Sequence, residues 1–194
     1  MTKTMGRGAV SDGQDTNRNS APTRILTGHK TITIYFSRSG NTEKQVHLAQ
    51  TILPTDVYEL VVTTPYPADY TAAVSRATME RDTQNWPELA DHLPDLSSYD
   101  TVLLAHPVWA MTLANPMRTF LEVAGKDLAN KRVASFSTNA GYGAGDTQQR
   151  LRQLISNTAT ILPNYTVEDR LATKTRNQFI SWLKTFNKEG YTID

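Results

Sequence analysis

The stretch TITIYFSRSGNTE, residues 31–43, decides the fold of this chain. Its first residues form an apolar, β-branched run typical of a buried strand, and a helical pattern follows. The turn between them carries Ser, Asn and Thr side chains and Gly40, which accepts a positive φ and lets the backbone approach a ligand closely. A helix N-terminus beside such a turn attracts anions, so the stretch predicts a cradle for a phosphate monoester. The alternative interpretation is a plain loop with a helix N-cap.

Several functional classes lack the residues that they need. The chain has neither a P-loop nor a Gly-x-Gly-x-x-Gly motif, which disfavours ATP hydrolysis and a Rossmann dinucleotide site. Cysteine is absent, so a thiolate nucleophile, a disulfide and a Cys-based zinc site are excluded. The four His residues show no paired spacing, and we expect no metal site. A phosphorylatable receiver domain would need acidic residues where Tyr35-Phe36 and Ala105-His106 stand.

Short apolar runs alternate with helical patterns after Thr31, with the strand first in each pair. This alternation predicts an α/β fold, namely a three-layer, doubly wound, five-stranded parallel sheet. The predicted strands lie near Thr31–Phe36, Asp56–Val61, Thr101–His106, Arg132–Ser137 and Thr158–Leu162, and the predicted helices near Thr42–Leu53, Tyr70–Gln84, Pro116–Ala124, Thr147–Asn157 and Thr175–Asn187. We expect Asp69 and Asp146 to N-cap helices and Gly125 to close one. Ligands of such sheets bind at the carboxyl ends of strands, here the first, third and fourth.

The 194 residues suit one domain with a tail. Residues 1–30 are polar and lack periodicity, which predicts a flexible leader before a domain at 31–194. The leader holds five Lys and Arg against two Asp and Glu, while the remainder holds fifteen against seventeen. We find no basic stripe for nucleic acid and no apolar run of signal-peptide or membrane-span length, so a cytoplasmic protein is expected.

Two further loops follow predicted strands. Residues 106–116 carry Trp109 between prolines, so a planar ligand could lie on the indole, although a Trp that covers the end of the sheet is an alternative. Residues 137–146 hold three Gly within five residues, which suits main-chain hydrogen bonds to a heteroaromatic ring or, alternatively, a ligand-free turn.

Four motifs together resemble the flavodoxin family. They are Tyr-Phe-Ser-x-Ser-Gly-Asn-Thr at 35–42, Pro-Tyr-Pro-x-Asp-Tyr at 65–70, His-Pro-Val-Trp with Asn-Pro-Met-Arg-Thr-Phe-Leu-Glu within 106–122, and Ser-Thr-Asn-Ala-Gly-Tyr-Gly at 137–143. The resemblance spans Thr31 to about Leu171 and implies a flavodoxin-like sheet with strand order 2-1-3-4-5 and bound FMN.

The resemblance also implies roles for single residues. The FMN phosphate would be held by Ser37, Ser39, Gly40, Asn41 and Thr42, with Arg38 pointing outward or contributing its amide. The ring would be lined by Pro107, Val108, Trp109 and Ala110, and its other edge by Thr138, Asn139, Gly141, Tyr142 and Gly143. No catalytic side chain is required because the flavin carries the chemistry. His106 is a candidate proton or hydrogen-bond donor, although a scaffold role is the alternative.

Two functions remain open under this resemblance. The first is an electron carrier that serves a redox partner protein. The second is an FMN-dependent oxidoreductase that takes hydride from NAD(P)H and reduces quinones or similar small acceptors. Many relatives have a Gly after the loop aromatic, where this chain has Ala110 and Met111, for which positive φ would cost about 1–2 kcal/mol each. This substitution and the mild acidity of the domain favour two-electron chemistry, whereas the short single domain favours a carrier. A flavin-free scaffold is the third possibility, and the sequence leaves a homodimer open.

Overall fold

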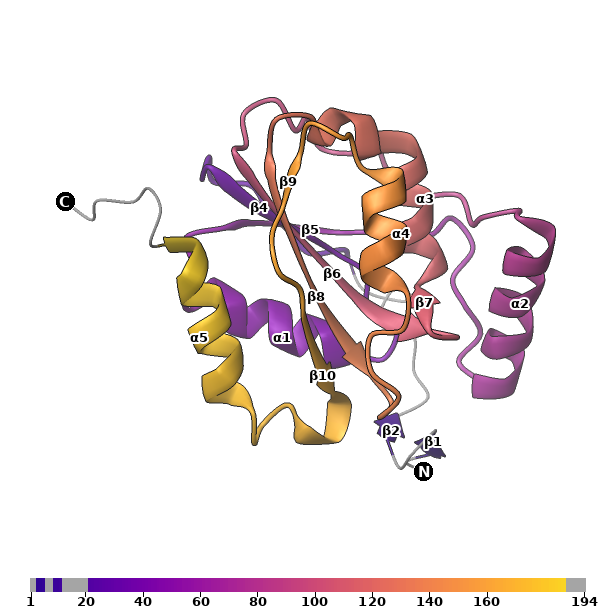
Figure 1. The fold of residues 1–194 in the computed structure, drawn as a ribbon. Helices are drawn as coiled ribbons and strands as arrows, with labels where there is room; N and C mark the ends of the chain where they lie inside the picture. Colours follow the sequence, from indigo (N-terminus) through magenta and orange to yellow (C-terminus); the bar gives the residue numbers. More distant parts are fainter. Residues whose placement is uncertain (1–2, 6–8, 12–20, 188–194) are drawn as a thin grey trace.

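The computed structural model describes residues 3–5, 9–11 and 21–187, and the central sheet is the first feature to note (Figure 1). Its strands lie in the order β10-β8-β6-β4-β5-β3. The five central ones are parallel, namely β4 (Thr31–Tyr35), β5 (Asp56–Glu59), β6 (Thr101–Trp109), β8 (Arg132–Asn139) and β10 (Tyr165–Glu168). This arrangement confirms the predicted fold class and the predicted order 2-1-3-4-5.

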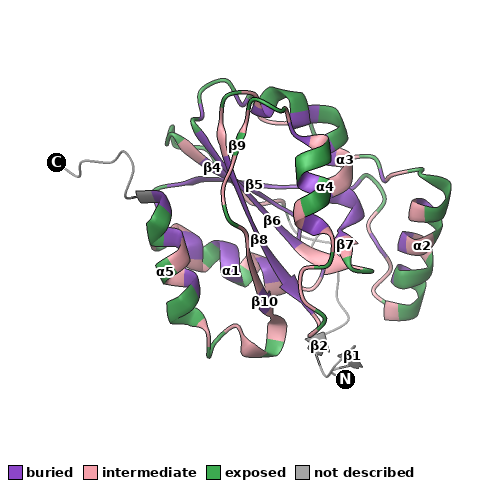
Figure 2. Cartoon of the chain, viewed as in Figure 1, coloured by how far each residue is buried: buried purple, intermediate pink, exposed green. Residues whose placement is uncertain are grey.

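Helices cover both faces of the sheet and make the two outer layers (Figure 1). They are α1 (Asn41–Gln50), α2 (Tyr70–Thr83), α3 (Asn115–Ala124), α4 (Thr147–Leu154) and α5 (Arg176–Asn187), with one-turn 3-10 helices at Gly125–Leu128 and Asp169–Leu171. Alternation along β4 explains the layering. Ile32 and Ile34 pack in the core under α2, α3 and α4, whereas Tyr35 packs in the core under α1 and α5. Figure 2 shows the strands buried between helices whose outer faces are exposed.

The predicted leader is the main error in domain organisation. Residues 24–25 form β3 (Arg24–Ile25), which pairs antiparallel with β5 at the edge of the sheet. The backbone amides of Thr27, Gly28 and His29 donate hydrogen bonds to the buried Asp56 carboxylate at 3.0–3.2 Å. The folded domain therefore begins before residue 31, because the buried carboxylate needs these donors. Short strands β1 (Lys3–Met5) and β2 (Ala9–Ser11) pair with each other, and the rest of the leader lies outside the described residues.

The fifth strand is split by a proline. The predicted strand Thr158–Leu162 corresponds to β9 (Thr160–Ile161), which pairs only with the start of β8. Pro163 has no N–H to donate, and the chain rejoins the sheet as β10, whose Glu168 lies opposite Asn139 at the end of β8. The fifth strand therefore ends at Glu168, later than the predicted end at Leu162.

The helix-end predictions have mixed outcomes. The Asp69 carboxylate accepts from the Ala72 amide at 2.8 Å, which confirms its N-cap role. Gly125 follows α3 but adopts a right-handed conformation and continues into a 3-10 helix; an added Cβ would lie 2.2 Å from the Leu154 carbonyl oxygen, so close packing requires glycine there. Asp146 precedes α4 without capping it, because its carboxylate pairs with Arg150 at 3.0 Å. A short antiparallel strand, β7 (Thr112–Leu113), folds back on the end of β6.

Candidate functional site

The turn between β4 and α1 has the form of an anion cradle. Gly40 occupies the N-cap position of α1 with φ of 80° and, as a glycine, supplies no side-chain cap to this helix end. The first-turn amides of a helix carry partial positive charge and need partners. Ser37 and Thr42 are buried beside the turn, while Ser39 and Asn41 are partly exposed. The turn therefore offers hydroxyl, amide and backbone donors to an anion.

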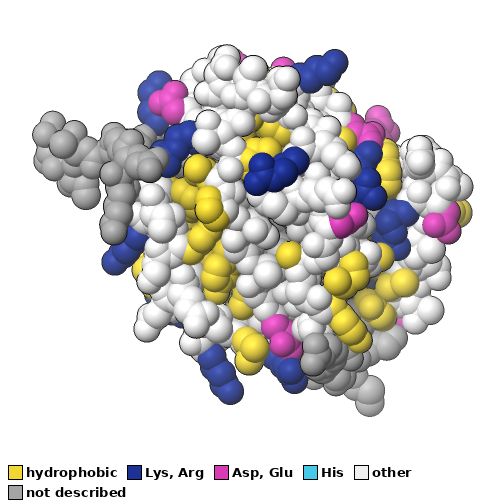
Figure 3. All heavy atoms as spheres, viewed as in Figure 1, with side chains coloured by type: hydrophobic (Ala, Val, Ile, Leu, Met, Phe, Trp, Pro, Cys, Tyr) yellow, Lys and Arg dark blue, Asp and Glu magenta, His cyan; other side chains and the backbone are white. Residues whose placement is uncertain are grey.

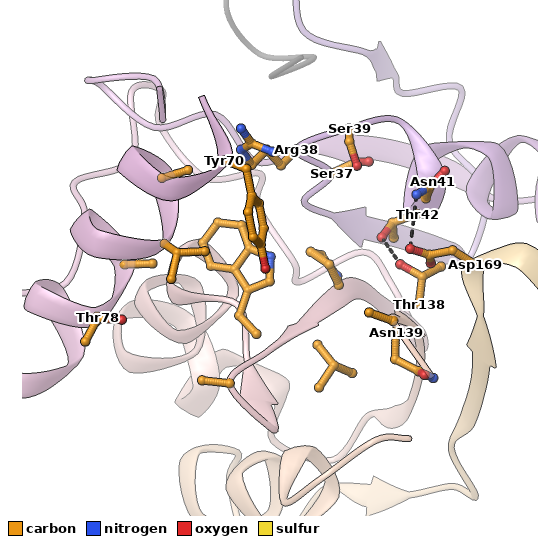
Figure 4. Close-up of a pocket in the computed structure, with 18 of the residues that line it drawn as sticks. Ser37, Arg38, Ser39, Asn41, Thr42, Tyr70, Thr78, Thr138, Asn139 and Asp169 are labelled. Carbon is orange, nitrogen blue, oxygen red and sulfur yellow. Dashed lines mark hydrogen bonds between the residues drawn. The ribbon is translucent and has the colours of Figure 1, made fainter. Parts of the chain in front are cut away.

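A cavity of about 360 Å³ opens beside this turn, and we call it the switch-point cavity (Figure 4). Such a volume falls within the range of about 300–1,000 Å³ typical of small-molecule sites. Its walls come from the ends of β4, β6, β8 and β10 and from α2. The cavity is lined by Ser37, Arg38, Ser39, Asn41, Thr42, Tyr70, Ala73, Val74, Ala77, Thr78, Arg81, Pro107, Val108, Trp109, Ala110, Thr138, Asn139, Ala140 and Asp169.

The lining includes all the predicted site residues except Gly40, Gly141, Tyr142 and Gly143. The glycine-rich loop is organised differently from the sequence expectation. The Gly141 and Gly143 amides donate to the Asn139 side-chain oxygen at 2.8 and 3.2 Å, so these donors are already engaged. Tyr142 is 58% exposed. Of the residues predicted for this edge of the site, Thr138 and Asn139 do line the cavity.

Arg38 does not point outward as the sequence analysis expects. It is buried, and its Nη2 donates to the carbonyl oxygens of Pro67 and Ala68 at 2.7 and 2.8 Å. Because those residues precede α2, the guanidinium links the turn between β4 and α1 to the helix that forms the opposite wall of the cavity.

Asp169 is a site residue that sequence reasoning missed. Figure 4 shows it beside Thr138 and Asn41 at one end of the cavity. Its Oδ2 accepts from the Asn41 side chain at 3.1 Å, and its Oδ1 has no hydrogen-bond partner among the described residues. Burial raises the pKa of Asp169 to about 6, against the lowering effect of hydrogen bonds from Asn41 and Thr138. The misplaced fifth strand hid this residue, because Asp169 directly follows β10.

Helix α2 supplies a second group of lining residues that the sequence analysis did not assign. Tyr70, at its first position, reaches into the cavity (Figure 4), and Ala73, Val74 and Ala77 form an apolar wall behind it. Alanine at the helical spacing 73 and 77 was the available signal, because small side chains on one face allow a ligand to approach the helix. Tyr66 instead is fully buried and donates to Glu80 at 2.5 Å.

The tip of the β6–β7 hairpin has an unusual backbone conformation. Trp109 pairs with Thr112 across the two-residue turn Ala110-Met111, whose φ angles are 47° and 63°. Positive φ at both central positions is typical of a type I′ turn, which favours Asn-Gly. Ala110 and Met111 both adopt this conformation although it costs a residue with a Cβ about 1–2 kcal/mol. The Asp146 amide holds the tip by donating to the Met111 carbonyl oxygen at 2.8 Å.

Replacing Ala110 by Gly should therefore stabilise the protein. We expect Ala110→Gly to raise the free energy of unfolding by about 0.5–1 kcal/mol, since the left-handed strain of about 1–2 kcal/mol is partly offset by the entropy of glycine. Urea unfolding measures the change. Ala129→Gly is the matched control, because Ala129 has a φ of −54° and should lose stability. A loss of stability in both variants would contradict the strain at Ala110.

His106 lies in the core and does not line the cavity. Its side chain is 0% exposed, and burial lowers its pKa to about 4. The Nδ1 atom lies 3.0 Å from the Pro107 carbonyl oxygen, which can only accept, so Nδ1 carries the proton. A neutral, buried imidazole does not supply a proton at neutral pH, and the structure does not support the candidate donor role.

A parallel doubly wound sheet with a cavity at its switch point defines the class of α/β proteins that bind a cofactor or nucleotide at the strand ends. Within this class, residues 30–186 match the family model described as flavodoxin, so the chain belongs to the flavodoxin family. No match was found among curated proteins. None of the helices in the described part of the chain is long and apolar enough to cross a membrane.

Solved structures share the fold at low sequence identity. A flavoprotein from Lactobacillus acidophilus NCFM, solved in complex with FMN, is 23% identical, with a TM-score of 0.61 over 75% of this chain and 97% of that one. Flavodoxin 1 from Bacillus cereus is 18% identical, with a TM-score of 0.55 over 84% and 100%. An NADH:FMN oxidoreductase in its apo form is 12% identical, with a TM-score of 0.54 over 85% and 92%.

Proposed function

We propose that this chain is an FMN-binding redox protein that holds the flavin non-covalently in the switch-point cavity and transfers electrons through it. The observation that carries the proposal is the turn between β4 and α1, where Gly40 is left-handed at the N-cap position and Ser37, Ser39 and Thr42 line the cavity beside the first turn of the helix. A phosphate monoester accepts hydrogen bonds of the kind that a helix N-terminus and neighbouring hydroxyl groups donate. The FMN complex of the Lactobacillus acidophilus flavoprotein, which shares the fold, supports the same assignment.

The chain's residues fit the rest of the cofactor as well. The phosphate would lie on the turn at residues 37–42, which we call the phosphate turn. The ring would lie among the aromatic and apolar side chains of Trp109, Tyr70 and α2. Bound FMN would supply the capacity to accept and release electrons. The protein would orient it, exclude water with the apolar wall at Ala73 and Ala77, and border its remaining edge with Thr138 and Asn139.

An electron carrier is the first candidate role, and an FMN-dependent NAD(P)H oxidoreductase that reduces quinones or similar acceptors is the second. The charge of residues 31–194 favours the second, because fifteen basic against seventeen acidic side chains give only a mild negative charge for steering a basic protein partner. The likeness to an NADH:FMN oxidoreductase agrees with that role. The redox partner, a homodimer and a cytoplasmic location stay predictions.

Reconstitution with FMN followed by anaerobic dithionite titration tests the proposal. Quenching of flavin fluorescence on addition of the protein measures binding, and visible absorbance during reduction then counts electrons. One-electron steps would support the carrier, and direct two-electron reduction would support the oxidoreductase. A chain that does not retain FMN would contradict the proposal and favour a flavin-free scaffold.

Removing the indole of Trp109 should weaken flavin binding. Phe36 and Tyr66 hold Trp109 edge-on, with ring centroids 5.5 and 5.0 Å away, so the indole is fixed at the cavity wall. We expect Trp109→Ala to lower FMN affinity about 10-fold, or ~1.4 kcal/mol of ring contact, and to raise the fluorescence of bound FMN. Trp182→Phe is the control, because Trp182 packs on the α5 side of the sheet. Unchanged emission in Trp109→Ala would remove the indole from the site.

A further inference from the structure

A second cavity of about 400 Å³ adjoins the switch-point cavity, and we call it the arginine cavity. It is lined by Arg81, Gln84, Trp86, Thr112, Leu113, Arg118, Glu122 and Arg150. Arg81 lines both cavities. The β6–β7 hairpin also lies between them, since Trp109 and Ala110 line one cavity and Thr112 and Leu113 line the other. A ligand in the arginine cavity could therefore reach the place proposed for the flavin ring.

The arginine cavity is rich in unused cationic donors. Arg118 pairs through Nε with Glu122 at 2.7 Å, and Arg150 pairs through Nε with Asp146 at 3.0 Å and through Nη1 with Gln153 at 3.1 Å. Arg81 uses only Nη2, which donates to Thr78 at 3.0 Å. Several guanidinium N–H groups have no hydrogen-bond partner among the described residues. They belong to the two Nη atoms of Arg118, to Nη2 of Arg150, and to Nε and Nη1 of Arg81.

Charge in this region is positive overall. Three guanidinium groups face the carboxylates of Glu122 and Asp146, which leaves a net charge of one positive (three minus two). Figure 3 shows dark-blue basic side chains gathered between α4 and α2, with magenta carboxylates beside them. The Arg118 guanidinium also lies 5.2 Å from the centre of the Trp86 ring, which restrains it at the wall. Restrained guanidinium groups with free N–H donors suit the oxygen atoms of phosphate.

We propose that the arginine cavity binds the phosphate groups of a nicotinamide dinucleotide whose nicotinamide enters the switch-point cavity beside the flavin. This inference rests on the second role proposed above and locates the binding site of its electron donor. Bound dinucleotide would supply a hydride, that is two electrons and one proton, and bound FMN would supply the capacity to accept it. The guanidinium groups bind and orient the donor and take no part in the transfer.

Calorimetric titration of NADP⁺ and NAD⁺ into the oxidised, FMN-loaded protein tests the site without turnover. We expect Arg118→Ala and Arg150→Ala each to weaken binding of NADP⁺ at least 10-fold and to leave FMN affinity unchanged, because neither residue lines the switch-point cavity. Arg118→Lys keeps the charge and should retain part of the affinity. The control is Arg152→Ala, an exposed residue of α4 outside both cavities.

The comparison of the two dinucleotides locates the phosphate. Equal losses for both would place the pyrophosphate among the arginines, and a loss confined to NADP⁺ would place its 2′-phosphate there. Absence of binding by either dinucleotide, or an equal loss in Arg152→Ala, would overturn the site. The same titration on the FMN-free chain separates the two proposals, since arginine-dependent binding there would support the arginine cavity even if FMN were not retained.

Discussion

Placing a carboxylate on the phosphate turn should abolish flavin retention. We expect Ser39→Glu to weaken FMN binding about 1,000-fold, because two unit charges about 4 Å apart interact by ~4 kcal/mol at an effective dielectric constant of ~20. Ser39 lines the cavity next to Gly40 and the first turn of α1. An acidic side chain at a helix N-terminus stabilises the helix, so the variant should fold. Fluorescence titration with FMN measures the loss.

A matched control separates local repulsion from a general effect of charge. Gln50→Glu adds one negative charge at the last position of α1. That position is about 14 Å from the first, at a rise of ~1.5 Å per residue, so bulk salt screens it from the turn. We expect this variant to bind FMN as the parent does. Tight FMN binding by Ser39→Glu would exclude the phosphate turn from the site.

The second large effect concerns Asp169, whose carboxylate lines the cavity and accepts a hydrogen bond from Asn41 at the start of α1. We expect Asp169→Asn to bind FMN about 30-fold more tightly than the parent at pH 8, because removal of a charge roughly 8 Å from a phosphate relieves ~2 kcal/mol at an effective dielectric constant of ~20. The amide can still accept from Asn41, which preserves the local hydrogen bond.

The advantage of Asp169→Asn should depend on pH in a defined direction. With a pKa raised by burial to about 6, Asp169 is protonated below pH 5 and charged above pH 7. The affinity ratio of variant to parent should therefore be near one at pH 5 and should rise through pH 6. Taking the ratio removes the titration of the phosphate itself, which has a second pKa of ~6. The charged neighbours Glu168, which raises the pKa, and Lys44, which lowers it, are retained in both proteins.

The free energy of unfolding of the unliganded protein should also depend on the charge of Asp169. Because the folded pKa lies above the ordinary value, the folded state binds the proton more tightly, and the stabilising effect is lost as pH rises through about 6. Asp169→Asn should therefore gain stability over the parent at pH 8. Asp91→Asn is the control, since Asp91 pairs with Arg24 of β3, at the opposite edge of the sheet from β10, and does not line the cavity. A pH-independent ratio, or weaker FMN binding by Asp169→Asn, would show that the carboxylate instead accepts hydrogen bonds from the ligand.

Residues 31–43 could be interpreted from sequence because their information is local. A buried strand, a turn that needs Gly40 and a helix follow one another within a few residues, and each element forms according to near-neighbour rules. The alternation of strands and helices then restricted the topology to a doubly wound sheet, because parallel strands need crossover connections of one hand. The fold, the strand order and the position of the turn between β4 and α1 were therefore accessible from the sequence.

Errors arose where a residue depends on a distant partner. Residues 24–29 were assigned to the leader because no feature of their own sequence indicates that the buried Asp56 accepts hydrogen bonds from amides in this segment. Asp169 was missed because the position of β10 depends on its pairing with the end of β8, across Pro163. The positive φ at Ala110 contradicts local preference, and the β6–β7 pairing with the contact from Asp146 maintains it.

The sequence by itself determined the class of fold, the glycine turn between the first strand and the first helix, and the resemblance to flavodoxins, since each depends on local sequence patterns. Only the tertiary structure decided which side chains face the cavity, that His106 is withdrawn into the core, and that an acidic side chain lies beside the phosphate turn. It alone brought Arg81, Arg118 and Arg150 together from three helices. The physical reason is that burial and charge are set by contacts between segments far apart in the chain, whereas strands, turns and helices respond first to their own neighbours.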